Sequence, residues 1–348
     1  MDRMDVPATL EANLVLAEKL PSLKLTKQKS LCSLWPTFLG RERSRSKIWL
    51  GLVLATSSWM LVCNYSSFTP SEPKSPKSKR DMPSRIISLS PNVTEILEGM
   101  GAFNQVIAVS DFCSYPPGVE NLPRVGGWQN SSLEEVTSLR PELVIMSEAQ
   151  APFVNRQLQA LGIETLVVPS QSLSDIFTAM RWIGKAVGRE SRSKRLRTEV
   201  QTQLRSIARR TQGLPKHPVL CVVDRVPGTL RDLYTATEGS YLTQLIEIAG
   251  GRSIAPPAGS NYVKIGKEAV VKLNPEVIID MVQGAKGRFG EDPIRIWSVL
   301  KEISAVRHGR VHAVRDMFVL HPSQFVVKTA ELFAKLIHPE AYGGEFNE

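Results

Sequence analysis

A duplicated segment constrains this chain more than any other feature of its sequence. Residues 133–145 read LEEVTSLRPELVI, and residues 267–279 read KEAVVKLNPEVII. In each copy a glutamate, Glu134 or Glu268, stands seven residues before a proline, and an apolar run follows. Each copy predicts a short helix, a break at the proline and a buried strand. We therefore predict two related lobes, each presenting one glutamate at the start of a helix.

Short apolar runs alternate with amphipathic segments in both halves, which is typical of parallel sheets covered by helices on both faces. The predicted fold class is therefore α/β, with two Rossmann-like lobes of parallel sheet. The pattern from Ser174 to about Thr211 repeats apolar residues at intervals of three and four, and predicts a single long α-helix that joins the lobes. The expected divisions are a leader (1–63), a linker (64–84), the N-terminal lobe (85–173), the connecting helix (174–212), the C-terminal lobe (213–340) and a tail (341–348).

The leader carries an export signal. Residues 48–62 form an apolar run of 15 residues behind the basic cluster RERSRSK at 41–47. A membrane span needs about 20 residues, so the run is typical of a signal-peptide core. Cys63 follows a segment that resembles a lipoprotein cleavage site, although Val62 is bulky there; lipidation of Cys63 and an uncleaved N-terminal anchor both stay open. We expect an exported protein, periplasmic or held on the outer side of the cytoplasmic membrane, with the Pro-, Ser- and Lys-rich linker as a tether.

The formal net charge of +9 belongs mainly to the leader and linker. Residues 1–80 hold 13 of the 43 Lys/Arg and 6 of the 34 Asp/Glu, which leaves 30 and 28 for the remainder. The folded part is nearly neutral, so nucleic acid is not an expected partner. The four cysteines form no CxxC pair. We expect Cys221 to be buried and Cys113 to be exposed, with no disulfide.

Catalytic and metal motifs are absent from the sequence. It contains no phosphate-binding loop, no GxSxG and no HExxH. The five histidines are scattered, so we expect neither a zinc cluster nor another bound metal of the protein's own. His321 stands directly before a proline, close in sequence to candidate ligand-binding residues that are described below. Two roles for it stay open: contact with a metal chelate, or initiation of a turn at the surface. The prediction is a protein that is not an enzyme and has no cofactor of its own.

In open parallel sheets, ligands bind beyond the carboxyl ends of the strands. The sequence places several aromatic and acidic residues directly after its predicted strands, so we expect them at this edge. Tyr262 lies on an expected loop of the second lobe. Such a set suits a large, partly apolar ligand with a few polar anchors. For Phe112 and Phe318, packing in the core explains the sequence equally well. The candidate ligand-binding residues are Phe112, Tyr115, Trp128, Tyr262, Asp316 and Phe318.

The repeated glutamates have an alternative role in helix capping. Ser131 with Glu134 fits a capping box, and Ser132 with Glu135 fits equally well. Glu268 lacks a Ser or Thr three positions before it and gains only from the helix dipole. Capping does not explain why both lobes place a glutamate at the same point. Two exposed carboxylates can instead pair bidentately with arginines on a partner.

Four segments together resemble one known family. RIISLSPNVTEILEGMGAFNQVIAVSDFCSYPP, LPRVGGWQNSSLEEVTSLRPELVI, QLQALGIETLVV and KEAVVKLNPEVII are similar to the substrate-binding proteins of vitamin B12 and ferric-siderophore ABC importers. The resemblance covers about residues 85–337. It implies two α/β lobes joined by one long helix, with the ligand between the lobes. It also implies that Glu134 and Glu268 dock onto arginines of the membrane permease.

The same resemblance implies roles in ligand binding. Aromatic residues matching Tyr115, Trp128 and Tyr262 surround the corrinoid in the B12-binding members, and an aspartate matching Asp316 lies at the cleft. Here Tyr262 stands where a tryptophan is usual, and Met317 replaces an aromatic residue. Ferric siderophores and haem therefore stay open beside a cobalamin-like corrinoid.

The predicted function is that of a substrate-binding component of an ABC importer, which delivers a small-molecule metal chelate to a permease and ATPase complex. We expect a monomer. One rival is a binding or sensor module that is not coupled to transport, and another is a chelatase-like enzyme on the same scaffold. Trp128 and Tyr262 each stand six residues before their lobe's glutamate, which places a ligand residue and a docking residue in one segment.

Overall fold

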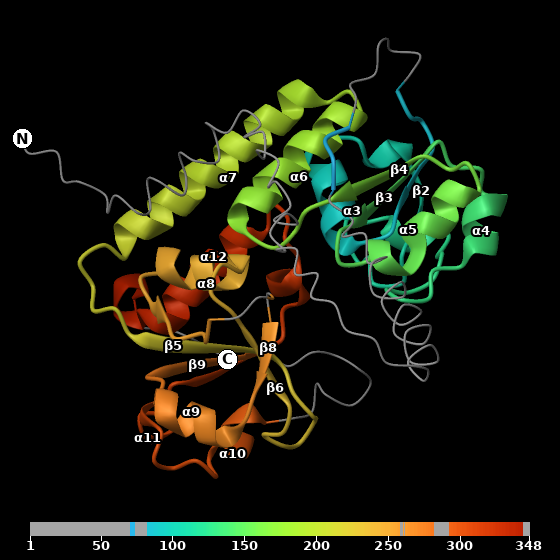
Figure 1. The fold of residues 1–348 in the computed structure, drawn as a ribbon. Helices are drawn as coiled ribbons and strands as arrows, with labels where there is room; N and C mark the ends of the chain where they lie inside the picture. Colours follow the sequence, from blue (N-terminus) through green and yellow to red (C-terminus); the bar gives the residue numbers. More distant parts are fainter. Residues whose placement is uncertain (1–69, 74–81, 258–259, 261, 282–291, 344–348) are drawn as a thin grey trace, which may run out of the picture. The chain divides into compact units, whose positions relative to one another are not determined.

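The computed structural model describes residues 70–73, 82–257, 260, 262–281 and 292–343. These residues form two sheets with helices on both faces of each, the first and second lobes (Figure 1). The expected signal peptide, Cys63 and most of the linker lie outside the described residues. Among the residues that are described, no helix combines the length and apolar composition needed to cross a membrane.

The sheet of the first lobe has the strand order β2-β1-β3-β4, and all of its pairings are parallel. Neighbouring residues of β1 point to opposite faces: Ile86 packs on one side and Ile87 on the other. Helices α3 and α6 cover the first of these faces, and α4 and α5 cover the second. The elements are β1 (Ile86–Ser88), α3 (Pro91–Gly99), β2 (Val106–Val109), α4 (Leu133–Ser138), β3 (Leu143–Ser147), α5 (Ala151–Ala160), β4 (Thr165–Val168) and α6 (Leu173–Ala186).

The sheet of the second lobe has the order β10-β9-β5-β6-β8, and a short β7 pairs with β5. Helices α8 and α12 cover one face, and α9, α10 and α11 cover the other. The elements are β5 (Pro218–Asp224), β6 (Leu233–Ala236), α8 (Tyr241–Ile248), β7 (Arg252–Ser253), β8 (Tyr262–Ile265), α9 (Lys267–Leu273), β9 (Val277–Met281), α10 (Pro293–Trp297), α11 (Ser304–Arg307), β10 (Val311–Val314), η5 (Met317–Leu320), α12 (Val326–Ile337) and η6 (Pro339–Tyr342).

The prediction of two α/β lobes is confirmed, but the second sheet is not purely parallel. Strand β6 runs antiparallel to both β5 and β8. The loop between β5 and β6 spans residues 225–232 and is closed by a bond from Val226 N–H to the Arg231 carbonyl at 3.0 Å, and within it Gly228 and Asp232 take positive φ angles of 71° and 53°. This hairpin reverses the chain where a helical crossover was expected. Tyr262, expected on a loop, is the first residue of β8.

The expectation of one continuous helix over 174–212 is wrong. The chain forms α6 and then α7 (Glu190–Arg210), with a turn at residues 187–189. Gly188 takes a φ of +65°, and Arg189 N–H donates back to the Gly184 carbonyl at 2.6 Å, which is a glycine-terminated helix end. Helix α7 returns along α6 and also contacts α8 and α12, so it is α7 that joins the lobes (Figure 1).

Candidate functional site

The two copies of the repeat adopt the same local structure. Glu134 and Glu268 both occupy the second position of their helices, α4 and α9, two residues after the N-cap. Each helix is followed by a residue with positive φ just before the proline, Arg140 at 47° and Asn274 at 43°. Strands β3 and β9 then pair with β1 and β5 in the same way. The duplication seen in the sequence is therefore a structural repeat.

Helix capping does not occupy either glutamate. The Ser132 hydroxyl accepts from the Glu135 N–H at 3.2 Å, while Ser131 donates its hydroxyl to the Gly127 carbonyl. Of the two capping alternatives, only the serine half of the second is observed: Ser132 caps α4, but its own N–H donates to the Val125 carbonyl, so the reciprocal bond to Glu135 that completes a capping box does not form. Within the described part of the chain, the exposed carboxylates of Glu134 and Glu268 make no ion pair. Both are free to meet a partner.

A second glutamate in each copy has a structural task. The Glu142 carboxylate accepts from the Ser84 N–H at 2.6 Å and the Arg85 N–H at 3.2 Å, and these bonds hold its pKa below the usual value. Its counterpart Glu276 lies 2.7 Å from Nδ1 of His217. Both side chains bind the residues that lead into the first strand of their lobe. No sequence pattern indicates this role for either glutamate.

Three candidate ligand residues of the first lobe lie on adjoining loops after β2. The Asp111 N–H donates to the Gly126 carbonyl at 3.0 Å, which joins the loop of Phe112 to the loop of Trp128. A Cβ atom placed on Gly127 would lie 3.4 Å from the Phe112 ring, so this ring packs directly on the glycine. Phe112 and Trp128 remain 58% and 37% exposed. The structure thus brings exposed aromatic surface to the carboxyl edge of the first sheet.

The loop that carries Phe112 and Tyr115 is held by groups that the sequence did not single out. Arg124 Nη1 donates to the carbonyls of Ser110 and Cys113 at 2.8 and 2.7 Å. The Cys113 thiol is buried between the Thr94 and Ser110 hydroxyls, and burial raises its pKa. The expectation of an exposed, reactive Cys113 is therefore wrong, because the loop turns this side chain into the core. Cys221 is buried, as expected.

The candidate residues of the second lobe lie on β8 and η5. Asp316 and Met317 are exposed, whereas Phe318 is half-buried and packs against the core. Tyr262 is 37% exposed, but its hydroxyl end lies in buried surroundings beside Tyr241. Burial raises the pKa of Tyr262 to about 12, so its hydroxyl is a hydrogen-bond donor at neutral pH.

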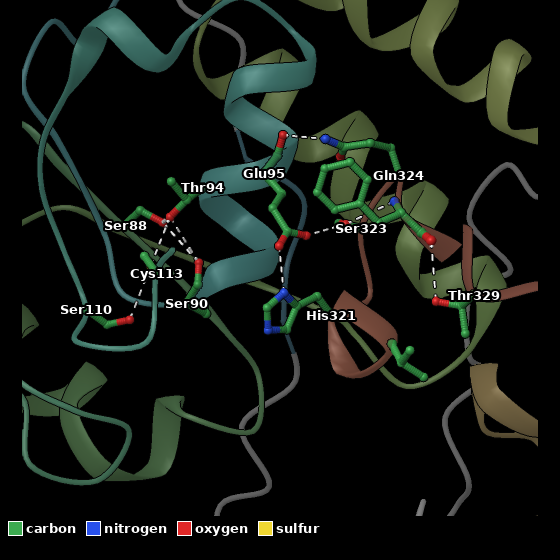
Figure 2. Close-up of polar contacts among 12 residues, drawn as sticks. Ser88, Ser90, Thr94, Glu95, Ser110, Cys113, His321, Ser323, Gln324 and Thr329 are labelled. Atoms are coloured by element: carbon green, nitrogen blue, oxygen red, sulfur yellow. Dashed lines mark hydrogen bonds and ion pairs between the residues drawn. The ribbon is translucent and has the colours of Figure 1, made fainter. Parts of the chain in front are cut away.

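Contacts between the lobes form close to these aromatic residues. The rings of Tyr115 and Phe325 meet edge to face, with centroids 5.0 Å apart. Glu95 of α3 bonds to three residues of the segment before α12 (Figure 2). Its carboxylate contacts His321 and Ser323, and its carbonyl accepts from Gln324 at 2.7 Å. Of these residues, only His321 is marked by the sequence, through the proline that follows it; Glu95 and Phe325 carry no such signal.

A buried ion pair lies at the carboxyl ends of β5 and β9. Asp280 Oδ2 accepts from Arg225 Nε at 2.9 Å and from Trp297 Nε1 at 2.8 Å. Both charged side chains are almost fully buried. No sequence signal pointed to this pair. Among the described residues, no group of three or more His, Cys, Asp or Glu side chains is arranged to hold a metal ion.

Comparison with known proteins agrees with this architecture. The model of the periplasmic binding protein family matches residues 86–316, which include strands of both sheets. The chain belongs to the periplasmic binding protein family. The prediction of a substrate-binding protein of the ABC-importer type is thereby confirmed.

Similar proteins include several with named ligands. An uncharacterized ABC transporter substrate-binding lipoprotein, YvrC of Bacillus subtilis, is 29% identical over 75% of this chain and 82% of its own length. The vitamin B12-binding protein of Pectobacterium carotovorum is 25% identical over 57% of this chain and 71% of its own length. The periplasmic heme-binding protein RhuT of Roseiflexus superposes with a TM-score of 0.64 at 24% identity, over 74% of this chain and 98% of that one. This last similarity shows the shared fold.

Proposed function

We propose that this protein carries a metal-centred chelate, either a corrinoid, haem or a ferric siderophore, to a membrane permease. It acts by binding and release without catalysing a reaction, and the chelate is its cargo and not a cofactor. The observation that carries the proposal is the matched pair of exposed glutamates, Glu134 and Glu268, which lie at the same helical position in two lobes and make no ion pair with any residue that the structure describes. The similarity to an ABC transporter lipoprotein and to B12-binding proteins supports it.

The glutamate pair suits docking to a permease. A carboxylate in the first turn of a helix is exposed to solvent and accepts two parallel hydrogen bonds from an arginine. One such group in each lobe lets a single partner contact both lobes at once. We propose that an ABC permease with its ATPase is that partner, and that the protein is exported and meets it as a monomer outside the cytoplasmic membrane.

The ligand site is proposed to lie between the carboxyl edges of the two sheets. Phe112, Tyr115 and Trp128 supply aromatic surface from the first lobe, and Tyr262 supplies it from the second. Exposed aromatic surface of this extent suits a large flat or rounded ligand more than a sugar or an amino acid. The exposed carboxylate of Asp316 supplies a polar anchor. The half-buried Phe318 supports this site from the core side.

Two measurements separate ligand binding from docking. Titration of the purified full chain with hemin, cyanocobalamin and ferric siderophores, followed by fluorescence quenching, should show saturable binding of one class. Saturation by none of them would reject the ligand proposal.

The docking test uses the double variant Glu134→Ala/Glu268→Ala in a strain that expresses the cognate permease. Uptake of the identified ligand should be abolished while its affinity for the purified protein stays unchanged. The matched control is Glu135→Ala/Glu302→Ala, which removes one exposed carboxylate from each lobe at other positions. Normal uptake by the Glu134/Glu268 double variant would refute the docking role.

A further inference from the structure

A histidine and a buried carboxylate are paired where the lobes meet. Glu95 is 3% exposed, and its Oε1 lies 2.6 Å from Nδ1 of His321. Its other carboxylate oxygen accepts from the Ser323 hydroxyl at 2.5 Å. His321 belongs to the segment between η5 and α12, directly after Asp316 and Phe318. Phe325 donates its N–H to the Ser323 hydroxyl and packs its ring on Tyr115, so the pair lies close to one of the residues assigned to the ligand.

This pairing determines which ring nitrogen is available. A carboxylate only accepts hydrogen bonds, so Nδ1 carries the hydrogen, and Nε2 is the ring nitrogen that can offer a lone pair to a metal. Within the described part of the chain, Nε2 of His321 has no hydrogen-bond partner. Figure 2 shows the ring with Nδ1 toward Glu95 and the other nitrogen turned away. The His321 side chain is 11% exposed, so the ring is held in place yet is not sealed off from solvent.

A second histidine–carboxylate pair provides a comparison. Nδ1 of His217 lies 2.7 Å from the Glu276 carboxylate, but His217 precedes β5, at the amino edge of its sheet. The Glu276 side chain is 44% exposed, in contrast to Glu95. The two pairs have the same local geometry and differ in burial and in position relative to the aromatic residues. Of these two pairs, that of Glu95 and His321 lies on the side of the proposed ligand.

We propose that Nε2 of His321 is an axial ligand to the metal of a bound tetrapyrrole, either the ferric iron of haem or the cobalt of a corrinoid. This inference rests on the proposed function and narrows its ligand class. Metal-bound histidines commonly donate their other ring N–H to a carboxylate, which orients the ring and raises its basicity. In the binding step, a water on the metal leaves and the Nε2–metal bond forms, with no change of oxidation state.

The primary test uses the absorption spectra of the full chain saturated with hemin or with aquocobalamin, whose metal-bound water can be exchanged. The wild-type protein should give the spectrum of a nitrogen-ligated metal with one of these probes, and the responding probe distinguishes haem from corrinoid. His321→Ala should lose this spectrum, and added imidazole should restore it. His217→Ala, the matched control, should keep it.

A second readout tests the role of the carboxylate. Glu95→Gln keeps a hydrogen-bond acceptor for Nδ1–H but removes the negative charge, so His321 becomes a weaker electron donor to the metal. The reduction potential of bound iron should rise, and the affinity for the tetrapyrrole should fall by up to about 10-fold. Glu276→Gln should change neither quantity.

The outcomes separate this inference from the proposed function. Identical spectra of wild-type protein and His321→Ala, both saturated with the tetrapyrrole, would overturn axial ligation and leave chelate transport standing. Binding of a ferric siderophore with no binding of hemin or aquocobalamin would also overturn it. Failure to bind any chelate would overturn both proposals.

Discussion

Replacing Glu95 with alanine should destabilise the protein far more than any substitution of an exposed glutamate. The variant removes the acceptor of two hydrogen bonds from residues of the other lobe, His321 and Ser323. Each polar group left unpaired in a buried site costs about 1–3 kcal/mol. For the two hydrogen bonds together, we expect the free energy of unfolding to fall by about 2–6 kcal/mol, a large part of the roughly 5–15 kcal/mol of an ordinary domain.

The matched control is Glu276→Ala, which breaks a histidine–carboxylate bond of nearly the same length. The Glu276 side chain is 44% exposed, so solvent screens the pair and water replaces the lost partner. Its loss should cost no more than about 1 kcal/mol. The difference between the two variants measures what burial adds to the same pair of groups.

Urea denaturation followed by tryptophan fluorescence measures both variants, because Trp128 and Trp182 lie in the first lobe and Trp297 in the second. A double-mutant cycle of Glu95→Ala with His321→Ala should give a coupling energy of about 1–3 kcal/mol. If Glu95→Ala and Glu276→Ala lowered stability equally, the reasoning from burial would be refuted. A coupling energy near zero would show that the bond between Glu95 and His321 contributes nothing.

Three further predictions follow from separate parts of the molecule. Burial holds the pKa of His312 below its usual value, so as the pH falls below about 6.5 the unfolded chain binds this proton before the folded chain does, and the stability of the fold decreases. The variant His312→Gln should therefore lose less of its urea midpoint than the wild type between neutral and mildly acidic pH. An unchanged pH dependence would contradict this. Gly184→Ala should destabilise the protein, because a Cβ atom at this position of α6 would collide with the side chain of buried Ser193 on α7. The collision should outweigh the helix preference of alanine over glycine, which is about 1 kcal/mol. A raised thermal midpoint would disprove the close packing of α6 on α7. Trp128→Ala and Tyr262→Ala should each weaken ligand binding by about tenfold or more. The control Phe153→Ala removes a similarly exposed ring on α5 and should bind the ligand normally. Equal ligand affinities of all three variants would show that Trp128 and Tyr262 are not part of the site.

The strands that the apolar pattern indicates most clearly are those buried along their whole length. The apolar runs that end the two repeat copies are observed as β3 and β9, in which every residue is buried, because the inner strands of a sheet covered on both faces need nearly continuous apolar sequence. Strands β6 and β8 were missed for the converse reason. Each is four residues long, and exposed Tyr234 and Tyr262 interrupt their apolar character. Short strands of this kind owe their structure to the hairpin partner more than to local preference.

The turn between α6 and α7 shows a second limit of sequence analysis. Apolar periodicity continues on both sides of Gly188, so the pattern alone describes one helix with a bend. What separates the helices is the positive φ of Gly188 together with the packing of Gly184 on Ser193. That packing is a contact between helices, which no local pattern reports.

The location of a site residue could be predicted from the sequence where it follows directly from the end of a predicted strand. It could not be predicted where it depends on contacts between residues far apart in the chain. Phe112 and Asp316 follow predicted strands, so their location at a carboxyl edge follows from the parallel sheet. The pair of Glu95 and His321 joins residues 226 positions apart, and only the folded chain brings them together. Arg124 likewise holds the loop of Phe112 through backbone carbonyls, which carry no sequence signal.

The duplicated segment acquires a physical explanation from the direction of its helices. In each copy the backbone N–H of the residue after the proline donates to a carbonyl at the beginning of the first strand of its lobe. Glu142 N–H donates to the Arg85 carbonyl, directly before β1, and Glu276 N–H donates to the carbonyl of Pro218, the first residue of β5, both at 2.9 Å. This places the end of each helix at the amino edge of its sheet and its beginning at the carboxyl edge. Glu134 and Glu268 therefore lie at the same edges as Trp128 and the other aromatic residues. On the proposed docking mode, a permease that contacts both glutamates would therefore cover the edges proposed to hold the ligand, and the topology of the repeat would couple docking to release.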